Sequence, residues 1–260
     1  MRNYAEETSA RVEYIRAYLK ASGARGIVYG NSGGKDSALV GILCKMACEN
    51  TVGIIMPCAS KRNYGMDKAD GLEVAEKFGI ETRTVDLTPV REAEMAALKG
   101  VTELTDMAVA NIAPRLRMTT LYAIAQSVDG GIVINTSNLS EDWVGYCTIY
   151  GDSAGAFSPL GMYTTEEVIA LGRALGLPER FLIKPPSDGL TGLTDEDNLG
   201  FTYHAVNEYI RRGVVDEKIK ADIDHKHAVS RFKFQTLPVY QNGLPIVLEE
   251  PTDYYNPDKK

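Results

Sequence analysis

Two kinds of apolar pattern alternate along this chain. Short runs rich in apolar or β-branched residues, each the length of a strand, occupy 27–29, 51–56, 81–87 and 131–134. Longer segments between them space their apolar residues three or four apart, which favours helices; they are 5–21, 38–47, 67–78 and 105–127. Strands that alternate with helices predict an α/β fold, in which a doubly wound, mainly parallel sheet carries helices on both faces.

Signals for helix ends add detail in the second half of the chain. Thr164 and Glu167 have the spacing of a capping box ahead of an apolar helical pattern. Thr194 is placed to cap a further helix. Between these helices, residues 182–193 are rich in Pro and Gly, so we expect a loop there.

Composition favours one globular domain, because 44% of the 260 residues are apolar and suffice for a core. We expect 1–260 to be that domain, with the polar, proline-punctuated residues 242–260 as a loosely ordered tail. No apolar run is long enough to span a membrane and the N-terminus is no signal peptide, so we place the protein in the cytoplasm. A net charge of −7 argues against a nucleic-acid partner. The four cysteines contain no CxxC, which favours buried thiols over a zinc site.

The segment 27–37, IVYGNSGGKDS, predicts a strand, a tight glycine-rich turn and the start of a helix. Successive backbone N–H groups point outward from such a turn, and the helix adds its positive dipole end. The segment therefore predicts an anion site. Ligands of parallel sheets bind beyond the carboxyl ends of the strands, so the segments after Tyr29, Met56 and Leu87 are expected to share one cleft.

Three motifs compete for the glycine-rich turn. A Walker A loop, GxxxxGK[ST], fails because Tyr29 stands at its first glycine and Asp36 follows Lys35. The nucleophile elbow GxSxG fits with Ser32 as nucleophile, but that elbow normally follows several strands and this turn follows the first; its histidine would be His204, His225 or His227. The motif SGGxDS is matched at every fixed position, by Ser32, Gly33, Gly34, Asp36 and Ser37.

In this context SGGxDS resembles the pyrophosphate loop of the ATP pyrophosphatase superfamily, whose members cleave ATP between its α and β phosphates to adenylylate an acceptor. Further motifs narrow the resemblance: NxxxRxRM, TSNxSE, GYxTxYGD, SPLG, KPPS and TDEDxLGxxY follow in that order. The set resembles the ammonia-dependent NAD synthetase family, and it covers roughly residues 25–210. The resemblance implies a fold like that of the adenine-nucleotide α-hydrolases. It also implies a ligase that converts nicotinate adenine dinucleotide (deamido-NAD), ATP and ammonia into NAD, AMP and pyrophosphate.

The resemblance also implies partners. The chain leaves no room for the glutaminase domain of larger relatives, so ammonia is expected to be free or to come from a separate protein. A homodimer is expected, because family members resemble one another in building the dinucleotide site partly from their subunit interface. No membrane partner is expected.

The implied chemistry explains the residue types. A carboxylate becomes reactive toward ammonia only as a mixed anhydride with AMP, so the phosphates must be held and the leaving pyrophosphate neutralised. The resemblance implies Mg²⁺ on Asp36 and Glu141, which suits an ion that takes few protein carboxylates and completes its shell with phosphate and water. It assigns catalysis to Asp36, Ser32 and Lys184, and the acid dinucleotide to Arg115, Asp152 and Lys233. It assigns ATP to Gly30, Ser32, Gly33, Gly34, Lys35, Asp36, Ser37, Met56, Thr136 and Ser187, with Pro57 and Cys58 also beside adenine.

Four positions depart from the pattern that the resemblance predicts. Ile149, Ala156, Thr165 and Phe232 stand where lysine, aspartate, lysine and histidine are expected. An altered acid pocket would mean either a different substrate or compensation by other cations; the candidates are Arg117, Arg231 and Lys184. Three alternatives therefore stay open: the same chemistry on another carboxylic acid, a tRNA-modifying enzyme, and a nucleotide-binding regulator without turnover.

Overall fold

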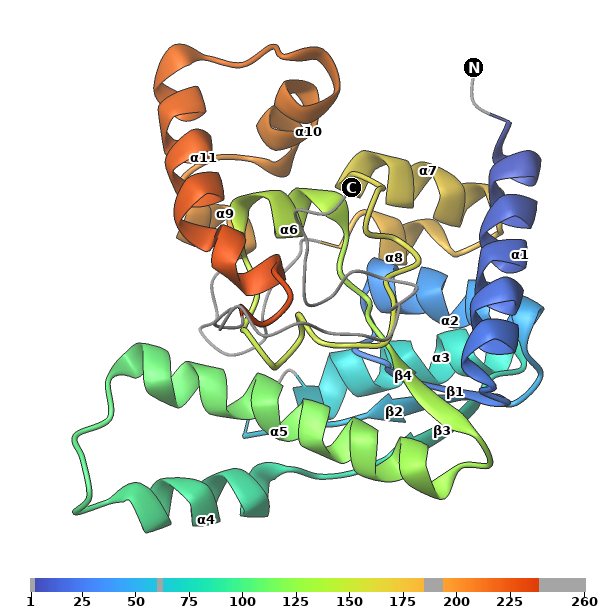
Figure 1. The fold of residues 1–260 in the computed structure, drawn as a ribbon, viewed down its shortest axis with the longest axis horizontal. Helices are drawn as coiled ribbons and strands as arrows, with labels where there is room; N and C mark the ends of the chain where they lie inside the picture. Colours follow the sequence, from blue (N-terminus) through green and yellow to red (C-terminus); the bar gives the residue numbers. More distant parts are fainter. Residues whose placement is uncertain (1–2, 60–62, 185–193, 239–260) are drawn as a thin grey trace, which may run out of the picture.

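The computed structural model describes residues 3–59, 63–184 and 194–238, and it is built on one parallel sheet of four strands, ordered β3-β2-β1-β4 (Figure 1). The chain moves outward from β1 to β3 and then returns to the other side of β1. Ligands of doubly wound sheets bind where the order reverses, which here is between β1 and β4. The four predicted strands are confirmed as β1 (Gly26–Gly30), β2 (Thr51–Ile55), β3 (Glu81–Thr84) and β4 (Gly131–Ile134).

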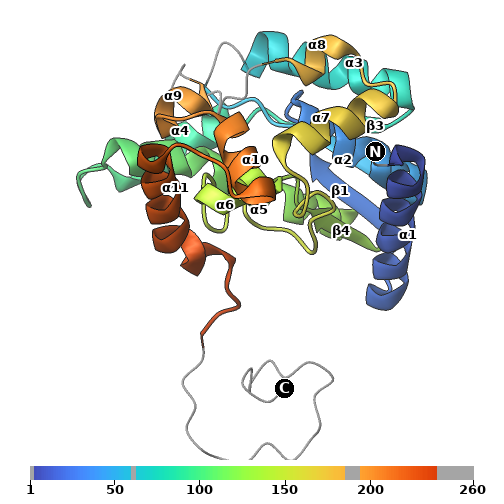
Figure 2. The same ribbon diagram turned by 90° about the horizontal axis from the view of Figure 1, so that it is seen from above.

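Helices cover both faces of the sheet (Figures 1 and 2). Side chains of β1 alternate between them, because successive strand residues point to opposite faces. Tyr29 packs with Leu39 on the face of α2, whereas Val28 packs with Leu121 of α5 on the other. Burial on both faces explains why the strands read as continuous apolar runs. The first half of the chain contains α1 (Tyr4–Ser22), α2 (Lys35–Ala47), η1 (Asn63–Asp67), α3 (Lys68–Phe78), α4 (Thr88–Leu98) and α5 (Asp106–Ser127).

The part of the chain that follows β4 is mainly helical. The predicted cap at Thr194 and the capping box of Thr164 with Glu167 are both confirmed. The predicted loop 182–193 falls almost wholly outside the described residues, as does the tail 242–260. The elements are α6 (Leu139–Val144), α7 (Thr165–Ala174), α8 (Glu179–Leu182), α9 (Asp195–Leu199), α10 (Tyr203–Arg212), α11 (Glu217–Ser230) and η2 (Arg231–Phe234). None of the described helices is both long and apolar enough to cross a membrane.

Tyr29 fills the layer between sheet and helix with unusual tightness. Its side chain is fully buried, and its hydroxyl has no hydrogen-bond partner among the described residues. A Cβ added to Gly41 of α2 would lie 2.2 Å from that oxygen, and one added to Gly53 of β2 would lie 3.0 Å away. Two glycines thus make room for one aromatic ring.

Contacts from helix α11 and the turn η2 hold α6 and the segment that follows it in place. The ring of Trp143 in α6 stacks on His227 of α11 with 4.2 Å between centroids. Lys233 of η2 donates to the carbonyl oxygens of Gly145 and Cys147, at 2.8 and 2.7 Å. The C-terminal part of the described chain therefore holds a loop that lies beside the end of β4.

Candidate functional site

The glycine-rich turn after β1 is held in one conformation by its own side chains. Asn31 donates from Nδ2 to the carbonyl of Gly71 (2.9 Å) and accepts from the N–H of Gly33 (3.3 Å). The N–H of Ser32 donates to Oγ of Ser37 (3.3 Å), and the two hydroxyl oxygens lie 3.0 Å apart. The turn and the first residues of α2 therefore form a fixed group of polar donors.

Gly33 is the position where the turn permits only glycine. Its φ is +73°, and a Cβ there would lie 2.3 Å from the carbonyl oxygen of Asp67. Gly33 supports the turn from behind and does not itself line the cleft. The residues of this segment that do are Gly30, Asn31, Ser32, Gly34, Lys35, Asp36 and Ser37.

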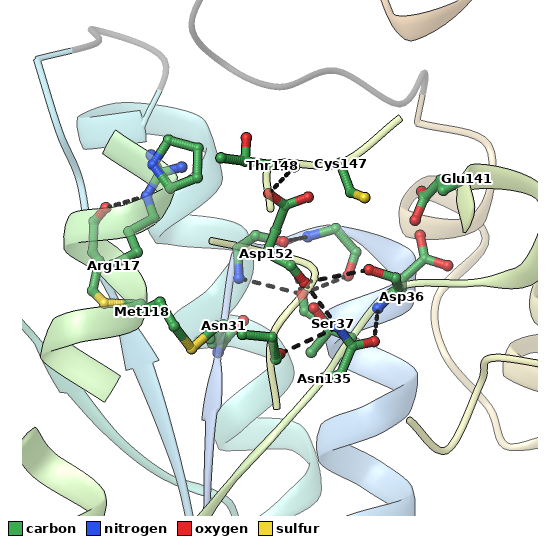
Figure 3. Close-up of a pocket in the computed structure, with 18 of the residues that line it drawn as sticks. Asn31, Asp36, Ser37, Arg117, Met118, Asn135, Glu141, Cys147, Thr148 and Asp152 are labelled. Carbon is green, nitrogen blue, oxygen red and sulfur yellow. Dashed lines mark hydrogen bonds between the residues drawn. The ribbon is translucent and has the colours of Figure 1, made fainter. Parts of the chain in front are cut away.

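A cleft of about 580 Å³ opens beyond the carboxyl ends of β1, β2 and β4 (Figure 3). One wall is apolar and comes mainly from β2 and α5; it includes Met56, Pro57, Met118 and Leu121. Met56 and Pro57 are expected beside a base, and both line this apolar wall. Cys58 was expected with them, but it is buried and does not line the cleft.

The segment after Leu87 was expected in the same cleft, and the structure corrects this. None of the residues after Leu87 up to the end of α4 lines it. β3 lies beyond β2 at one edge of the sheet, so its end is two strands away from the reversal between β1 and β4. The ends of β1, β2 and β4 supply the cleft instead.

Asn138 holds the two candidate metal ligands together. Its Nδ2 donates to Oδ1 of Asp36 (2.9 Å), and its backbone N–H donates to Oε2 of Glu141 (3.3 Å). Its Oδ1 accepts from the N–H groups of Ser140 and Glu141, which begins α6 with a capping box. One cap thus links the start of α6 to the start of α2.

Around this cap the carboxylates of Asp36, Glu141 and Asp195 outnumber the ammonium of Lys35. Desolvation, followed by repulsion from Asp36, holds the pKa of Glu141 well above its usual range. Burial works to lower the pKa of Lys35, but Asp36, Glu141 and Asp195 together raise it above its ordinary value. Two adjacent carboxylates of this kind fit a divalent cation, whose charge would offset their repulsion.

The protein offers the cation few other ligands. Within residues 3–59, 63–184 and 194–238 no three His, Cys, Asp or Glu side chains are grouped to hold a metal ion. Asp36 and Glu141 form a pair, and such a pair suits Mg²⁺ bound jointly with phosphate oxygens.

The polar rim of the cleft is formed by the loop after α6. Asp152 accepts at Oδ1 from the N–H of Thr148 (2.9 Å), and its carbonyl accepts from Nδ2 of Asn135 (2.8 Å). The Asp152 side chain is exposed to the cleft, yet desolvation by the surrounding protein raises its pKa. Thr136 and Lys233 also line the cleft, as predicted.

No side chain of the described cleft is an activated nucleophile. Burial and the charge of Asp152 raise the pKa of Cys147 to about 12, so this thiol stays protonated at neutral pH. Ser32 is bonded to Ser37, and the described lining residues include no histidine. His204 pairs with Glu166, His227 forms a hydrogen bond with the carbonyl of Trp143, and His225 is exposed outside the lining. The nucleophile-elbow hypothesis is therefore left without its base.

Besides Gly33 and Cys58, the predicted site residues Lys184 and Arg115 differ from expectation in placement. Lys184 lines the cleft, but its ammonium is paired with Asp67 (2.9 Å) and Asp70 (2.7 Å) at the start of α3. Arg115 is exposed and outside the cleft lining, because successive residues of α5 point in different directions; it donates to the carbonyl of Ile149 (3.3 Å). Ser187 lies outside the described residues.

The four departures from the family pattern also lie outside the described lining. Phe232 is 59% exposed, and the carbonyl of Ala156 accepts from the hydroxyl of Tyr18 of α1. Thr165 is buried behind the site, where its hydroxyl lies 3.5 Å from Oδ1 of Asn138. Within one chain, none of these four positions contributes to the described wall of the cleft.

Sequence reasoning missed several residues that shape the cleft. Asn138 lies inside TSNxSE and Asn31 directly precedes SGGxDS, so motif membership was an available signal for both. Arg117 lines the cleft and donates to the carbonyl of Met56 (3.3 Å). It was considered only as a compensating cation. Nothing in the sequence indicated that Lys35 would be buried.

The comparisons with known proteins agree with this geometry. Residues 7–241 match the family model of NAD synthase. An NH(3)-dependent NAD(+) synthetase of Carboxydothermus hydrogenoformans is 40% identical over 215 residues, 81% of this chain and 87% of that protein. The solved NMN synthetase of Francisella tularensis is 33% identical with a TM-score of 0.86, over 93% of this chain and all of that one. The NH3-dependent NAD synthetase of Campylobacter jejuni, solved with a nitrate ion, is 30% identical with a TM-score of 0.74, over 92% of this chain and all of that one. The chain belongs to the NAD synthase family.

Proposed function

We propose that this protein is an ATP-dependent amide ligase that forms NAD from deamido-NAD and ammonia, releasing AMP and pyrophosphate. One observation carries the proposal. A glycine-rich phosphate turn and the carboxylates of Asp36 and Glu141 meet at the mouth of an apolar pocket, joined by Asn138. That arrangement provides for a base, a polyphosphate and its cation in one place.

The residues of the turn would act on the phosphates. Ser32, Gly34 and Ser37 offer backbone N–H and hydroxyl donors at the start of α2, where the helix dipole favours an anion. Asp36 and Glu141 would hold Mg²⁺, which when bound neutralises the pyrophosphate as it leaves. Met56 and Met118 would flank the base, and Thr136 would contact the nucleotide.

The remaining polar groups would serve the acid substrate. Asp152 and Lys233 lie on the rim of the cleft. Arg117 lies in the apolar wall and would place a cation inside the cleft, whereas Arg115 lies outside the cleft of its own chain. Lys184 would reach phosphate only by giving up Asp67 and Asp70. The proposed reaction also requires that the acyl-adenylate be shielded from water until ammonia arrives.

The test is product identification. The purified protein, given ATP, Mg²⁺, ammonium and deamido-NAD, should yield NAD and AMP in equal amounts by mass spectrometry. Omitting ammonium should abolish NAD. Absence of NAD with a folded, ATP-binding protein would instead favour a regulator without turnover.

One observation favours a second candidate for the acid substrate, nicotinate mononucleotide. The NMN synthetase of Francisella tularensis matches this chain with a TM-score of 0.86 against 0.74 for the Campylobacter jejuni NAD synthetase. The same chemistry on nicotinate mononucleotide would give NMN. Values of kcat/KM for the two acids, measured side by side, decide between them; a mononucleotide preference above about tenfold would replace the leading proposal.

The protein is also proposed to be a cytoplasmic homodimer of single-domain subunits that uses small molecules only. Support for the dimer comes from Arg115, a predicted substrate contact that is exposed outside the cleft of its own chain. A neighbouring subunit would place it beside the acid. Sedimentation should give about twice the mass of one chain, 28.4 kDa, and a tRNA gel-shift should be negative.

A further inference from the structure

Lys35 has an unexpected position at the centre of the acidic cluster. It is the first residue of α2, and its side chain is only 5% exposed. Its Nζ lies 2.9 Å from Oδ2 of Asp36, while the other oxygen of that carboxylate accepts from Asn138. Both oxygens of Asp36 are therefore occupied, one of them by an ammonium.

Helix stability does not account for this position. A cation in the first turn of a helix opposes the macrodipole, and a lysine normally keeps its charged end in water. Burying an ammonium is unfavourable unless carboxylates surround it. Asp36, Glu141 and Asp195 act on Lys35 in that way, so the acids of the candidate metal site account for its burial.

We infer that Lys35 is a counter-ion that competes with the divalent cation for Asp36, so that the metal binds weakly until ATP is present. The inference rests on the proposed function, because it takes Asp36 and Glu141 as the metal ligands. With ATP in the cleft, the ammonium moves from Asp36 to a phosphate oxygen beside the same turn. Lys35 lines the cleft and has the flexible stem that this short movement requires.

The consequence is mutual dependence between nucleotide and metal. Lys35 lowers the affinity of the empty protein for the cation, and ATP removes that competitor as it brings its own phosphate ligands. Metal and ATP therefore strengthen each other's binding by equal factors, as linkage requires. Lys35 touches the phosphates in the loaded state and so takes a direct part in nucleotide binding.

The test measures metal binding without turnover. Mn²⁺ titrations followed by electron paramagnetic resonance, in the absence of nucleotide, compare the wild type with Lys35→Met and Lys35→Arg. Removing one positive charge a few ångströms from a divalent ion should tighten binding by at least about tenfold. Lys35→Arg keeps the charge and should bind Mn²⁺ as weakly as the wild type. Lys45→Met, in the last turn of the same helix, is the matched control and should change nothing.

A nucleotide arm and a stability arm complete the experiment. A non-hydrolysable ATP analogue should reduce the difference in Mn²⁺ affinity between the wild type and Lys35→Met. Mg²⁺ alone should raise the melting temperature of Lys35→Met more than that of the wild type. If Lys35→Met is unfolded without metal, its refolding on addition of Mg²⁺ supports the inference, and failure to refold overturns it.

The outcomes separate the inference from the proposed function. If Lys35→Met binds Mn²⁺ no more tightly than the wild type, while Asp36→Asn still weakens binding in the presence of the analogue, the inference is wrong and the metal site stands. If adding Asp36→Asn to Lys35→Met leaves Mn²⁺ binding unchanged, Asp36 is no metal ligand. The inference and the proposed metal site are then both wrong.

Discussion

At the scale of single residues, the motifs located the phosphate turn and the acids but not their pairings. Ser32 and Asp36 of SGGxDS and Glu141 of TSNxSE all line the cleft, and their contacts with ATP and metal stay predictions. The ion pairs of Lys184 could not be predicted, because Asp67 and Asp70 are more than a hundred residues away along the chain. The position of Arg115 depends on the rotation of α5, which a motif does not specify.

Asp36→Asn should lower AMP formation by about a hundredfold or more, because it removes a charged metal ligand that faces the leaving pyrophosphate. Steady-state assays with deamido-NAD or nicotinate mononucleotide check this. Asp106→Asn, in the exposed first turn of α5, is the control and should keep full activity. An Asp36→Asn enzyme with wild-type turnover would remove Asp36 from the mechanism.

Glu141→Gln should impair turnover while leaving the fold intact. The amide oxygen of glutamine still accepts from the backbone of Asn138, so the capping box survives, but the charge for the metal is lost. Circular dichroism and kinetics at several Mg²⁺ concentrations are measured together. Unchanged kinetics throughout would show that Glu141 serves only as a cap.

At the scale of elements, predictability followed the number of side chains that a helix buries. The helix expected at 5–21 became α1, which buries Val12, Ile15 and Leu19. No sequence-based prediction covers α4, none of whose residues is buried. Helix α11 buries only Ile223 and Ser230, which explains why its sequence gave as little signal.

The contact between β1 and α2 gives a coupled prediction. Tyr29→Phe should leave stability unchanged or raise it by about 1 kcal/mol, because it removes a buried hydroxyl without a partner among the described residues. Gly41→Ala should be strongly destabilising, since its Cβ would lie 2.2 Å from that oxygen. In the Tyr29→Phe background, Gly41→Ala should lower the free energy of unfolding by less. Denaturant unfolding of the four proteins measures the coupling, and strict additivity would contradict it.

The contact between α7 and α10 predicts a pH effect. The hydrogen bond and charge of Glu166 raise the pKa of His204. A raised pKa means that the pair stabilises the fold at low pH and that this contribution is lost as pH rises through the folded pKa. NMR titration should give His204 a pKa above 6.5 that falls in Glu166→Gln. The same change at Glu6 of α1 should not affect it.

At the scale of the whole molecule, the order of strands and helices predicted the α/β fold and the edge of the sheet where the cleft lies. It did not predict that the end of β3 stays outside the cleft, because sheet order is fixed by contacts between distant segments. It also gave no sign of the contacts that η2 makes with the loop after α6.

Arg115→Ala tests how subunits cooperate. If a neighbouring subunit brings Arg115 to the acid, the substitution should raise the KM for the acid by about tenfold or more and leave the KM for ATP nearly unchanged, since burying a carboxylate or phosphate unpaired is unfavourable. Lys20→Ala, at the end of α1, is the control. An equal rise in both KM values, or a monomer with full activity, would contradict the shared site.

Lys233 donates two hydrogen bonds to the carbonyls of Gly145 and Cys147. These bonds affect when, during synthesis, the protein becomes able to bind its acid substrate. The phosphate turn is translated early, but the rim of the cleft is fastened by a residue near the end of the described chain. A ribosome-bound fragment ending before α11 would therefore form the sheet and the turn while its rim stayed unfastened. Competence to bind the acid should appear late and abruptly in translation, after η2 has left the exit tunnel.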